Sequence, residues 1–208
     1  MELLVQSQIM YYASLVGGVA FALSGFLAGT KKNLDWMGLF ILSFLTANGG
    51  GILRDVLVDR TPVILQTNEP FFIALSVTVF ASLLRLGHRS SIENRWLFVI
   101  CDAVGLVAFA ITGALVGLSV HAPFFGFVAL AFLTATGGAI LRDILVNNIP
   151  EVLHGGFYGS IAILVAVAIY ILDRYGMLGP LNLMGIFLAG LMLRLIAYRY
   201  NWQLPKHD

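Results

Sequence analysis

Two copies of an arginine–aspartate pair are the residues of this sequence best suited to carry a chemical function. Arg54-Asp55 and Arg142-Asp143 each lie in a long apolar stretch, where an ionisable side chain is costly unless it pairs with an opposite charge or faces water. Successive residues of a helix point about 100° apart, so neither arginine is expected to pair well with its own aspartate. We therefore expect pairing between the copies, Arg54 with Asp143 and Arg142 with Asp55, either as a structural clamp or as part of a pore.

Glycines precede both pairs by about one helical turn. Gly49, Gly50 and Gly51 stand before the first pair, and Gly137 and Gly138 stand before the second. Glycine inside a helix costs up to about 1 kcal/mol relative to alanine, so such clusters are expected to break or kink the helix and to free backbone groups. The alternative is close helix packing through small residues. Their recurrence beside charge favours a binding or permeation site.

Polar side chains recur in the same apolar stretches and would together form a hydrophilic path. The residues expected to line it are Ser14, Ser24, Thr46, Asn48, Asp102, Thr112, Thr134 and Thr136. Neutral oxygens and carboxylates suit a hydrated monovalent cation better than an apolar solute, although any single hydroxyl could instead bond a carbonyl of its own or a neighbouring helix. Asp102, which has no basic residue at helical spacing within its stretch, is either an interfacial residue that reaches water or a cation-attracting group at a pore mouth.

The elements that hold these residues must lie in a membrane, because the composition is far from that of a soluble protein. Of the 208 residues, 59% are hydrophobic and only 11% are charged, whereas about 25% of a soluble domain is charged. So few charges cannot cover the surface of a soluble domain of this size, which excludes a soluble enzyme. The net charge of +1 provides no basic excess for nucleic acid. We predict an all-α integral membrane protein.

Seven apolar stretches meet or approach the length of about 20 residues that a membrane-spanning helix needs. They use about 140 residues and leave only short connections, so residues 1–208 are predicted to form a single membrane domain. The approximate limits of the seven stretches are 8–29, 36–58, 70–87, 96–118, 124–146, 155–172 and 177–198.

Lysine and arginine in the connections predict the orientation of the chain in the plasma (inner) membrane. Eight basic residues fall on one side and two on the other, and the basic side is expected to be cytoplasmic. The N-terminus is then outside and the C-terminus inside. Arg194, near a helix end, is expected to extend towards the headgroups. The eight are Lys31, Lys32, Arg85, Arg89, Arg95, Arg194, Arg199 and Lys206, and the two are Arg60 and Arg174.

The chain contains an internal duplication. Residues 44–58 align without a gap to residues 132–146, and residues 20–29 align to residues 108–117 at the same offset of 88. Two matches in one register indicate that the two halves arose from one sequence.

The duplicated unit contains three spans, so the second copy is expected to enter the membrane from the opposite side. Residues 8–88 form the first repeat, residues 96–173 the second, and residues 177–198 an additional seventh span. Such inverted 3+3 repeats are common in transporters, whose sites lie at the interface between the repeats.

The sequence carries no signature of catalysis or of a bound cofactor. It has no Ser/His/Asp order, no phosphate-binding loop and no dinucleotide motif. The single cysteine, Cys101, excludes a disulfide framework and a cysteine-based metal site. We expect no enzymatic activity, no cofactor and no structural metal, only transient monovalent cations.

The seven spans, the inverted repeat and the doubled motif resemble the prokaryotic branch of the TRIC (trimeric intracellular cation) channels, whose bacterial members are often labelled putative glycine transporters. The motif reads Gly-Gly-Gly-x-x-Arg-Asp over 49–55 and Gly-Gly-x-x-x-Arg-Asp over 137–143, and the resemblance covers nearly the whole chain. It implies a homotrimer with one pore per protomer, between the repeats, that conducts potassium, sodium or other monovalent cations. Unlike animal relatives, the sequence has no lysine within its fourth span.

Two functions remain open at this point. One is a passive cation channel with its pore at the two glycine-rich helices. The other is a secondary transporter for a small zwitterion such as glycine, with exposed amide ends of broken helices holding the substrate carboxylate. The expected partners are further copies of the chain, the lipid bilayer and monovalent cations.

Overall fold

The computed structural model describes residues 2–88, 91–154 and 157–205, and every regular element in these ranges is helical. This confirms the prediction of an all-α protein. Two of the eight basic residues used to predict the orientation, Arg89 and Lys206, lie outside the described residues. The α-helices are α1 (Glu2–Thr30), α2 (Trp36–Leu57), α3 (Glu69–Leu83), α4 (Ser91–Ser119), α5 (Phe124–Leu145), α6 (Glu151–His154), α7 (Gly159–Arg174) and α8 (Pro180–Arg199), with short 3-10 helices η1 (Val63–Leu65) and η2 (Leu86–His88).

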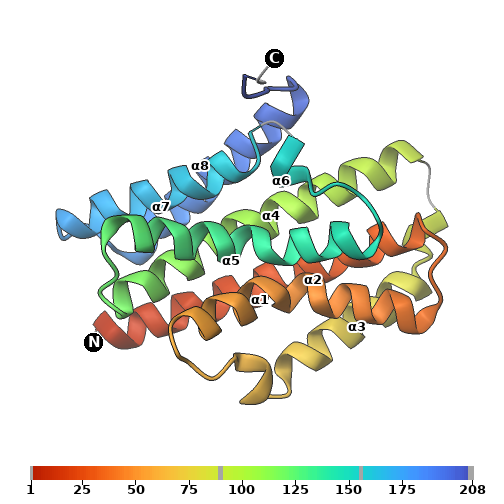
Figure 1. The fold of residues 1–208 in the computed structure, drawn as a ribbon, viewed down its shortest axis with the longest axis horizontal. Coiled ribbons are helices and arrows are strands. Elements are labelled where there is room, and N and C mark those ends of the chain that lie inside the picture. Colours follow the sequence, from red (N-terminus) through yellow and green to blue (C-terminus); the bar gives the residue numbers. More distant parts are fainter. Residues whose placement is uncertain (1, 89–90, 155–156, 206–208) are drawn as a thin grey trace.

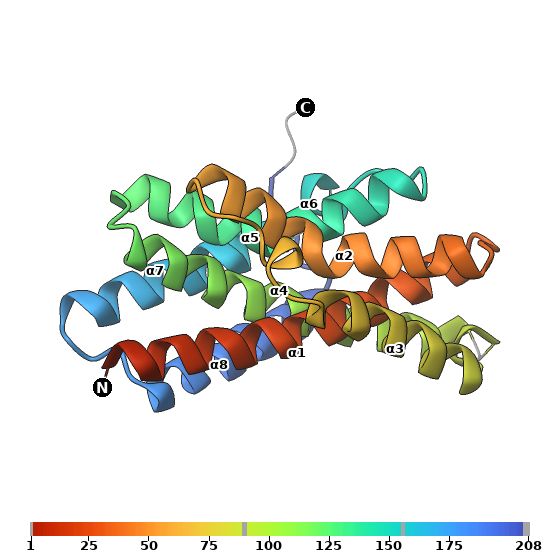
Figure 2. The ribbon, with the colours of Figure 1, turned by 90° about the horizontal axis from the view of Figure 1, so that it is seen from below.

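The long helices run lengthwise beside one another as a bundle (Figures 1 and 2). Within the described residues, α1, α2, α4, α5 and α8 each contain a segment long and apolar enough to cross a bilayer. Helices α3 and α7 have 15 and 16 residues. At 1.5 Å per residue they are about 23 and 24 Å long, less than the bilayer core of about 30 Å. The third and sixth spans are thus shorter than the sequence predicts.

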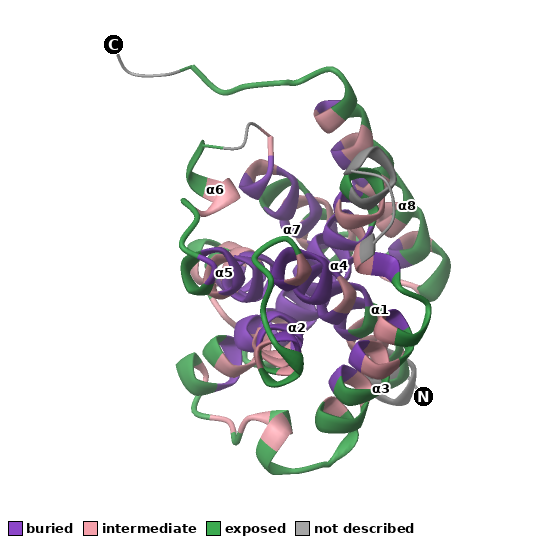
Figure 3. Ribbon diagram, turned by 90° about the vertical axis from the view of Figure 1, so that its right-hand side faces the viewer, coloured by how far each residue is buried: buried purple, intermediate pink, exposed green. Residues whose placement is uncertain are grey.

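Four helices form the centre of the bundle. The most extensive contacts join α1, α2, α4 and α5, while α3 packs on α1 and α2, α7 packs on α5 and α4, and α8 packs on α4 and α7. Buried residues gather where the four central helices meet (Figure 3). Large apolar side chains on the outside are more than half exposed, including Met37, Leu83, Phe125 and Leu181. Exposed apolar surface on this scale suits a protein whose periphery contacts lipid.

Helices α2 and α5 remain helical through their glycines, so neither helix is broken there, contrary to expectation. The glycines instead allow the two helices to touch. A Cβ atom on Gly50 would collide with the carbonyl oxygen of Thr134, and one on Gly138 would collide with the carbonyl oxygen of Thr46. Small residues permit such close backbone approach in membrane helices.

The α2–α5 contact is reciprocal and antiparallel. A Cβ atom on Gly49 would strike Leu141, and one on Gly137 would strike Leu53. As the residue number rises along α2 it falls along α5, so the helices run in opposite directions at the crossing. Every contact occurs twice. Replacing each residue of one contact by its repeat equivalent, 88 positions away in the sequence, gives the residues of the other contact.

Candidate functional site

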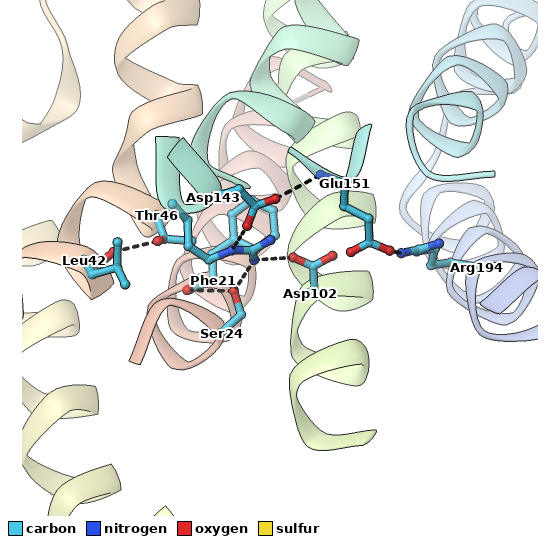
Figure 4. A network of polar contacts seen from close by, with 9 residues as sticks. Phe21, Ser24, Leu42, Thr46, Asp102, Asp143, Glu151 and Arg194 are labelled. Atoms are coloured by element: carbon cyan, nitrogen blue, oxygen red, sulfur yellow. Dashed lines mark hydrogen bonds and ion pairs between the residues drawn. The ribbon is translucent and has the colours of Figure 1, made fainter. Parts of the chain in front are cut away.

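Arg142, near the C-terminal end of α5, is the centre of a buried polar cluster that joins three helices. Figure 4 shows its partners Ser24, Asp102 and Asp143. Nε of Arg142 donates to Asp143 Oδ1 at 2.9 Å, and its Nη1 donates to Asp102 Oδ1 on α4 at 2.5 Å and to Ser24 Oγ on α1 at 2.9 Å. The guanidinium carbon lies 4.7 Å from the centroid of the Phe98 ring, a cation–π contact. Arg142 is completely buried and Asp102 is 1% exposed, so the ion pair is shielded from solvent.

The cluster extends from Arg142 to the C-terminal helix. The second carboxylate oxygen of Asp143 accepts a hydrogen bond from the backbone N–H of Glu151 at 3.0 Å, at the start of α6. Glu151 Oε1 in turn accepts from Arg194 Nη2 on α8 at 2.6 Å. Arg194 is 3% exposed and lies over the Tyr158 ring. The prediction that Arg194 extends towards the headgroups is therefore wrong, because Arg194 binds the Glu151 carboxylate and the Tyr158 ring inside the protein.

The Arg54 group repeats part of this arrangement at the end of α2. Nε and Nη2 of Arg54 both lie 2.9 Å from Asp55 Oδ1, and Asp55 Oδ2 accepts from the Val63 backbone N–H at 3.4 Å, at the start of η1. Positions 63 and 151 are again 88 residues apart. In each half, therefore, one aspartate oxygen holds the preceding arginine and the other caps the next short helix.

Pairing between the two copies does not occur, which corrects the prediction of Arg54–Asp143 and Arg142–Asp55 ion pairs. Each arginine bonds its own aspartate, because its side chain is long enough to reach around the helix. The antiparallel crossing at the glycines also separates the copies. Arg54 and Asp143 each lie beyond the crossing on their own helices, about ten residues or 15 Å apart along the axis.

Most of the predicted pore-lining side chains bond their own helix. Six of them donate to a carbonyl three or four residues earlier, namely Ser24, Thr46, Asn48, Thr112, Thr134 and Thr136. Ser24 also accepts from Arg142, as described above. Asp102 is neither at the surface nor unpaired, which differs from both roles expected for it. Sequence reasoning missed Glu151, Tyr158 and Arg194, because their partners are distant in the chain.

Two cavities flank the α2–α5 crossing, one at the C-terminal end of each helix. The cavity beside Arg54 has a volume of about 210 Å³, and the cavity beside Arg142 has a volume of about 570 Å³. Ser14, Asn48 and Gly51 line the first, whereas Thr46, Thr112, Thr134 and Thr136 line neither. Because α2 and α5 are antiparallel, the cavities lie at opposite ends of the pair.

Two side chains in the connections beside the larger cavity have shifted pKa values. Partial burial, together with the charges of Arg95 and Arg142, lowers the pKa of Lys31 in the α1–α2 turn. Burial, together with the negative charge of Asp102, raises the pKa of Glu151 although Arg194 opposes the shift. Among the described residues, no three His, Cys, Asp or Glu side chains gather as a metal site would require.

Comparison with known sequences identifies relatives over nearly the whole chain. A family model described as glycine transporter matches residues 11–86 and again residues 99–174. The two matches begin 88 residues apart, so the family unit occurs twice in this chain. The chain is also 34% identical to the membrane protein YvgT of Bacillus subtilis, over 94% of this chain and 95% of that protein.

Comparison with solved structures identifies the fold as that of TRIC channels. A prokaryotic TRIC channel crystallised in 0.5 M KCl superposes with a TM-score of 0.87 at 31% identity, over 95% of this chain and 100% of that one. A TRIC trimeric intracellular cation channel orthologue from Rhodobacter sphaeroides superposes with a TM-score of 0.84, also at 31% identity, over 93% and 98% of the two chains. None of these three relatives is described as an enzyme. The chain is a membrane protein that belongs to the TRIC channel family and contains twice the family unit described as glycine transporter.

Proposed function

We propose that this protein is a potassium-permeable channel for monovalent cations. The observation that carries the proposal is the likeness, over 93–95% of its length, to solved TRIC cation channels. The two cavities at opposite ends of the α2–α5 pair support it, because a permeation path must open on both sides of a membrane. The path would run between the repeats, past Gly49–Gly51 on α2 and residues 137–138 on α5.

Carboxylates of the Arg142 cluster lie beside the larger cavity. Arg142 and Arg194 contribute two positive charges, whereas Asp102, Asp143 and Glu151 contribute three negative charges. Lys31 and Lys32 line the same cavity and add two positive charges, so the support for a cation is the presence of the carboxylates of Asp143 and Glu151 in the cavity wall, because carboxylates near a pore attract cations. In this proposal the Arg–Asp pairs both hold the helices and set the charge beside the path.

The two halves form an inverted repeat in this proposal. The first would comprise residues 8–88 and the second residues 96–173, with the seventh span, α8 (Pro180–Arg199), added after them. The reciprocal, antiparallel contact of α2 with α5 supports this relation, since a two-fold axis in the membrane plane exchanges both partners of every contact. The repeats would meet along these two helices.

The proposed assembly is a homotrimer in the inner membrane, with one pore in each protomer. A relative whose fold matches closely is described as trimeric, and the bundle exposes large apolar side chains available to lipid or to further copies. The N-terminus would lie outside and the C-terminus in the cytoplasm.

Single-channel recording of the purified protein in planar bilayers tests the function. With KCl at different concentrations on the two sides, unitary currents should appear and reverse near the potassium equilibrium potential. Asp102→Asn removes one negative charge of the cluster and should shift the reversal potential towards zero, while Ser119→Ala, at the far end of α4, should leave it unchanged. Currents that reverse near the chloride potential, or the absence of unitary currents, would contradict the proposal.

A second candidate is a secondary transporter for a small zwitterion such as glycine. The description of the family model favours it, and Arg54, rather than the amide end of a broken helix, would be its carboxylate partner. Saturable uptake of glycine into liposomes without unitary currents would establish this function in place of the channel.

A further inference from the structure

The two arginine groups are unequal, although they occupy equivalent positions. Arg142 bonds two carboxylates and a hydroxyl. Arg54 contacts only Asp55, through a hydrogen bond from Nε and an ion pair at Nη2. Each arginine has one Nη atom without a hydrogen-bond or ion-pair partner among the described residues, Nη1 in Arg54 and Nη2 in Arg142. The two halves therefore differ in the number of carboxylates that pair with the arginine, one in the first half and two in the second.

The difference follows from substitutions between the repeats. At the offset of 88, Ser14 occupies the place of Asp102, so the second carboxylate is missing from the first half. Ser14 and Arg54 line the same cavity of about 210 Å³, and Arg54 is only 5% exposed. The cavity occupies the position at which the second half supplies its additional carboxylate.

The rest of the cavity wall contributes further polar and charged groups. Asn48 contributes an amide, and Arg60 and Glu69 contribute one charge of each sign. Neither Arg60 nor Glu69 forms a side-chain hydrogen bond or ion pair with another described residue. Together with the Arg54–Asp55 pair, the wall is formally neutral and presents a free cationic donor and a free carboxylate.

We propose that this cavity binds the carboxylate group of a small ligand, with Arg54 as its main partner. Guanidinium groups are suited to carboxylates because their planar donors match the two oxygens. Sites for drug-sized ligands range from about 300 to 1,000 Å³, so this smaller cavity suits a ligand of a few heavy atoms. Both a simple carboxylate and an amino-acid zwitterion, whose ammonium group Glu69 would receive, have this chemistry.

Binding to the full chain in nanodiscs tests the proposal without an ion gradient, so its failure is distinct from failure of the channel proposal. Labelled glycine is the probe, and acetate and methylamine are competitors. Glycine should bind saturably and methylamine should not compete. Competition by acetate would show that the carboxylate suffices, and its absence would assign the ammonium a role at Glu69. No saturable glycine binding and no acetate binding would overturn the proposal.

Ser14→Asp is the decisive variant, because it gives Arg54 the second carboxylate that Arg142 already has. Affinity for the probe should fall at least about tenfold, as expected when a competing carboxylate occupies the arginine, while the melting temperature is maintained. Asn68→Asp places the same charge next to Glu69 but outside the cavity wall, and should leave affinity within about twofold. Equal binding by the wild type and Ser14→Asp would overturn the proposal.

Should Ser14→Asp fail to fold, Arg60→Gln in the same wall should weaken binding, and unchanged affinity would again overturn it.

Discussion

At the scale of single residues, the Arg142 cluster shows how this bundle accommodates buried charge. Removal of Arg142 from water is compensated by Asp102, Asp143, Ser24 and the Phe98 ring, because a buried ion is tolerated only when its partners replace the lost hydration. Arg54 makes fewer bonds, although both arginines line a cavity. Identical dipeptides in the two halves thus have different environments.

Replacement of the polar residue at position 102 should therefore lower the stability of the protein, whereas replacement at the equivalent position 14 should not. Asp102→Asn leaves Arg142 with Asp143 as its single carboxylate and should lower the free energy of unfolding by about 3 kcal/mol, the lower end for a broken buried pair. Ser14→Ala at the equivalent position should change it by less than about 0.5 kcal/mol. Unfolding in detergent micelles measures both. A smaller loss for Asp102→Asn than for Ser14→Ala would refute the asymmetry.

The polar residues could be predicted from the sequence, but not their partners. Arg54, Asp55, Arg142 and Asp143 were identified from charge within apolar stretches. Their pairing was predicted wrongly, because the angle between adjacent helical positions says little about how far an arginine side chain can reach. The Asp102–Arg142 bond joins residues 40 positions apart, and neither local spacing nor composition indicates such a contact.

At the scale of helices, the α2–α5 crossing depends on the absence of a side chain at two positions. The predicted helix break rested on the low helix propensity of glycine, which is a local property. The observed close approach depends on the opposite helix, whose carbonyl oxygens occupy the space that a Cβ atom would need. The limits of the apolar segments within the five long helices, by contrast, were predictable, because apolar length is a property of the sequence alone.

Alanine at the crossing should push the two helices apart. In Gly50→Ala or Gly138→Ala the new methyl group meets backbone, which cannot move aside as a flexible side chain would. Overpacking of this kind should cost about 1–3 kcal/mol of unfolding free energy. The matched control is Gly185→Ala on α8, where no atom lies within 4 Å of the added Cβ, so stability should be unchanged or slightly higher. Melting temperatures of all three variants decide this, and equal values for Gly50→Ala and the wild type would contradict it.

At the scale of the whole molecule, the orientation proposed from basic residues is open to direct measurement. Cys101, the single cysteine, is buried, so the wild type offers a low background for thiol labelling. Val120→Cys, in the α4–α5 connection, should react with an impermeant maleimide in intact cells. Lys32→Cys, in the α1–α2 turn, should react only after permeabilisation. The reverse pattern would invert the proposed topology.

The reciprocal glycine contact has an evolutionary consequence. A contact in which the same patch occurs on both partners is the form taken by interfaces between identical subunits. A three-helix unit with such a patch can bury it only against a second copy of itself. Joining two copies in one chain holds the second copy at a high effective concentration. It also allows the sequences of the two copies to diverge. The exchange of Asp102 for Ser14 is a difference that two identical subunits could never have acquired.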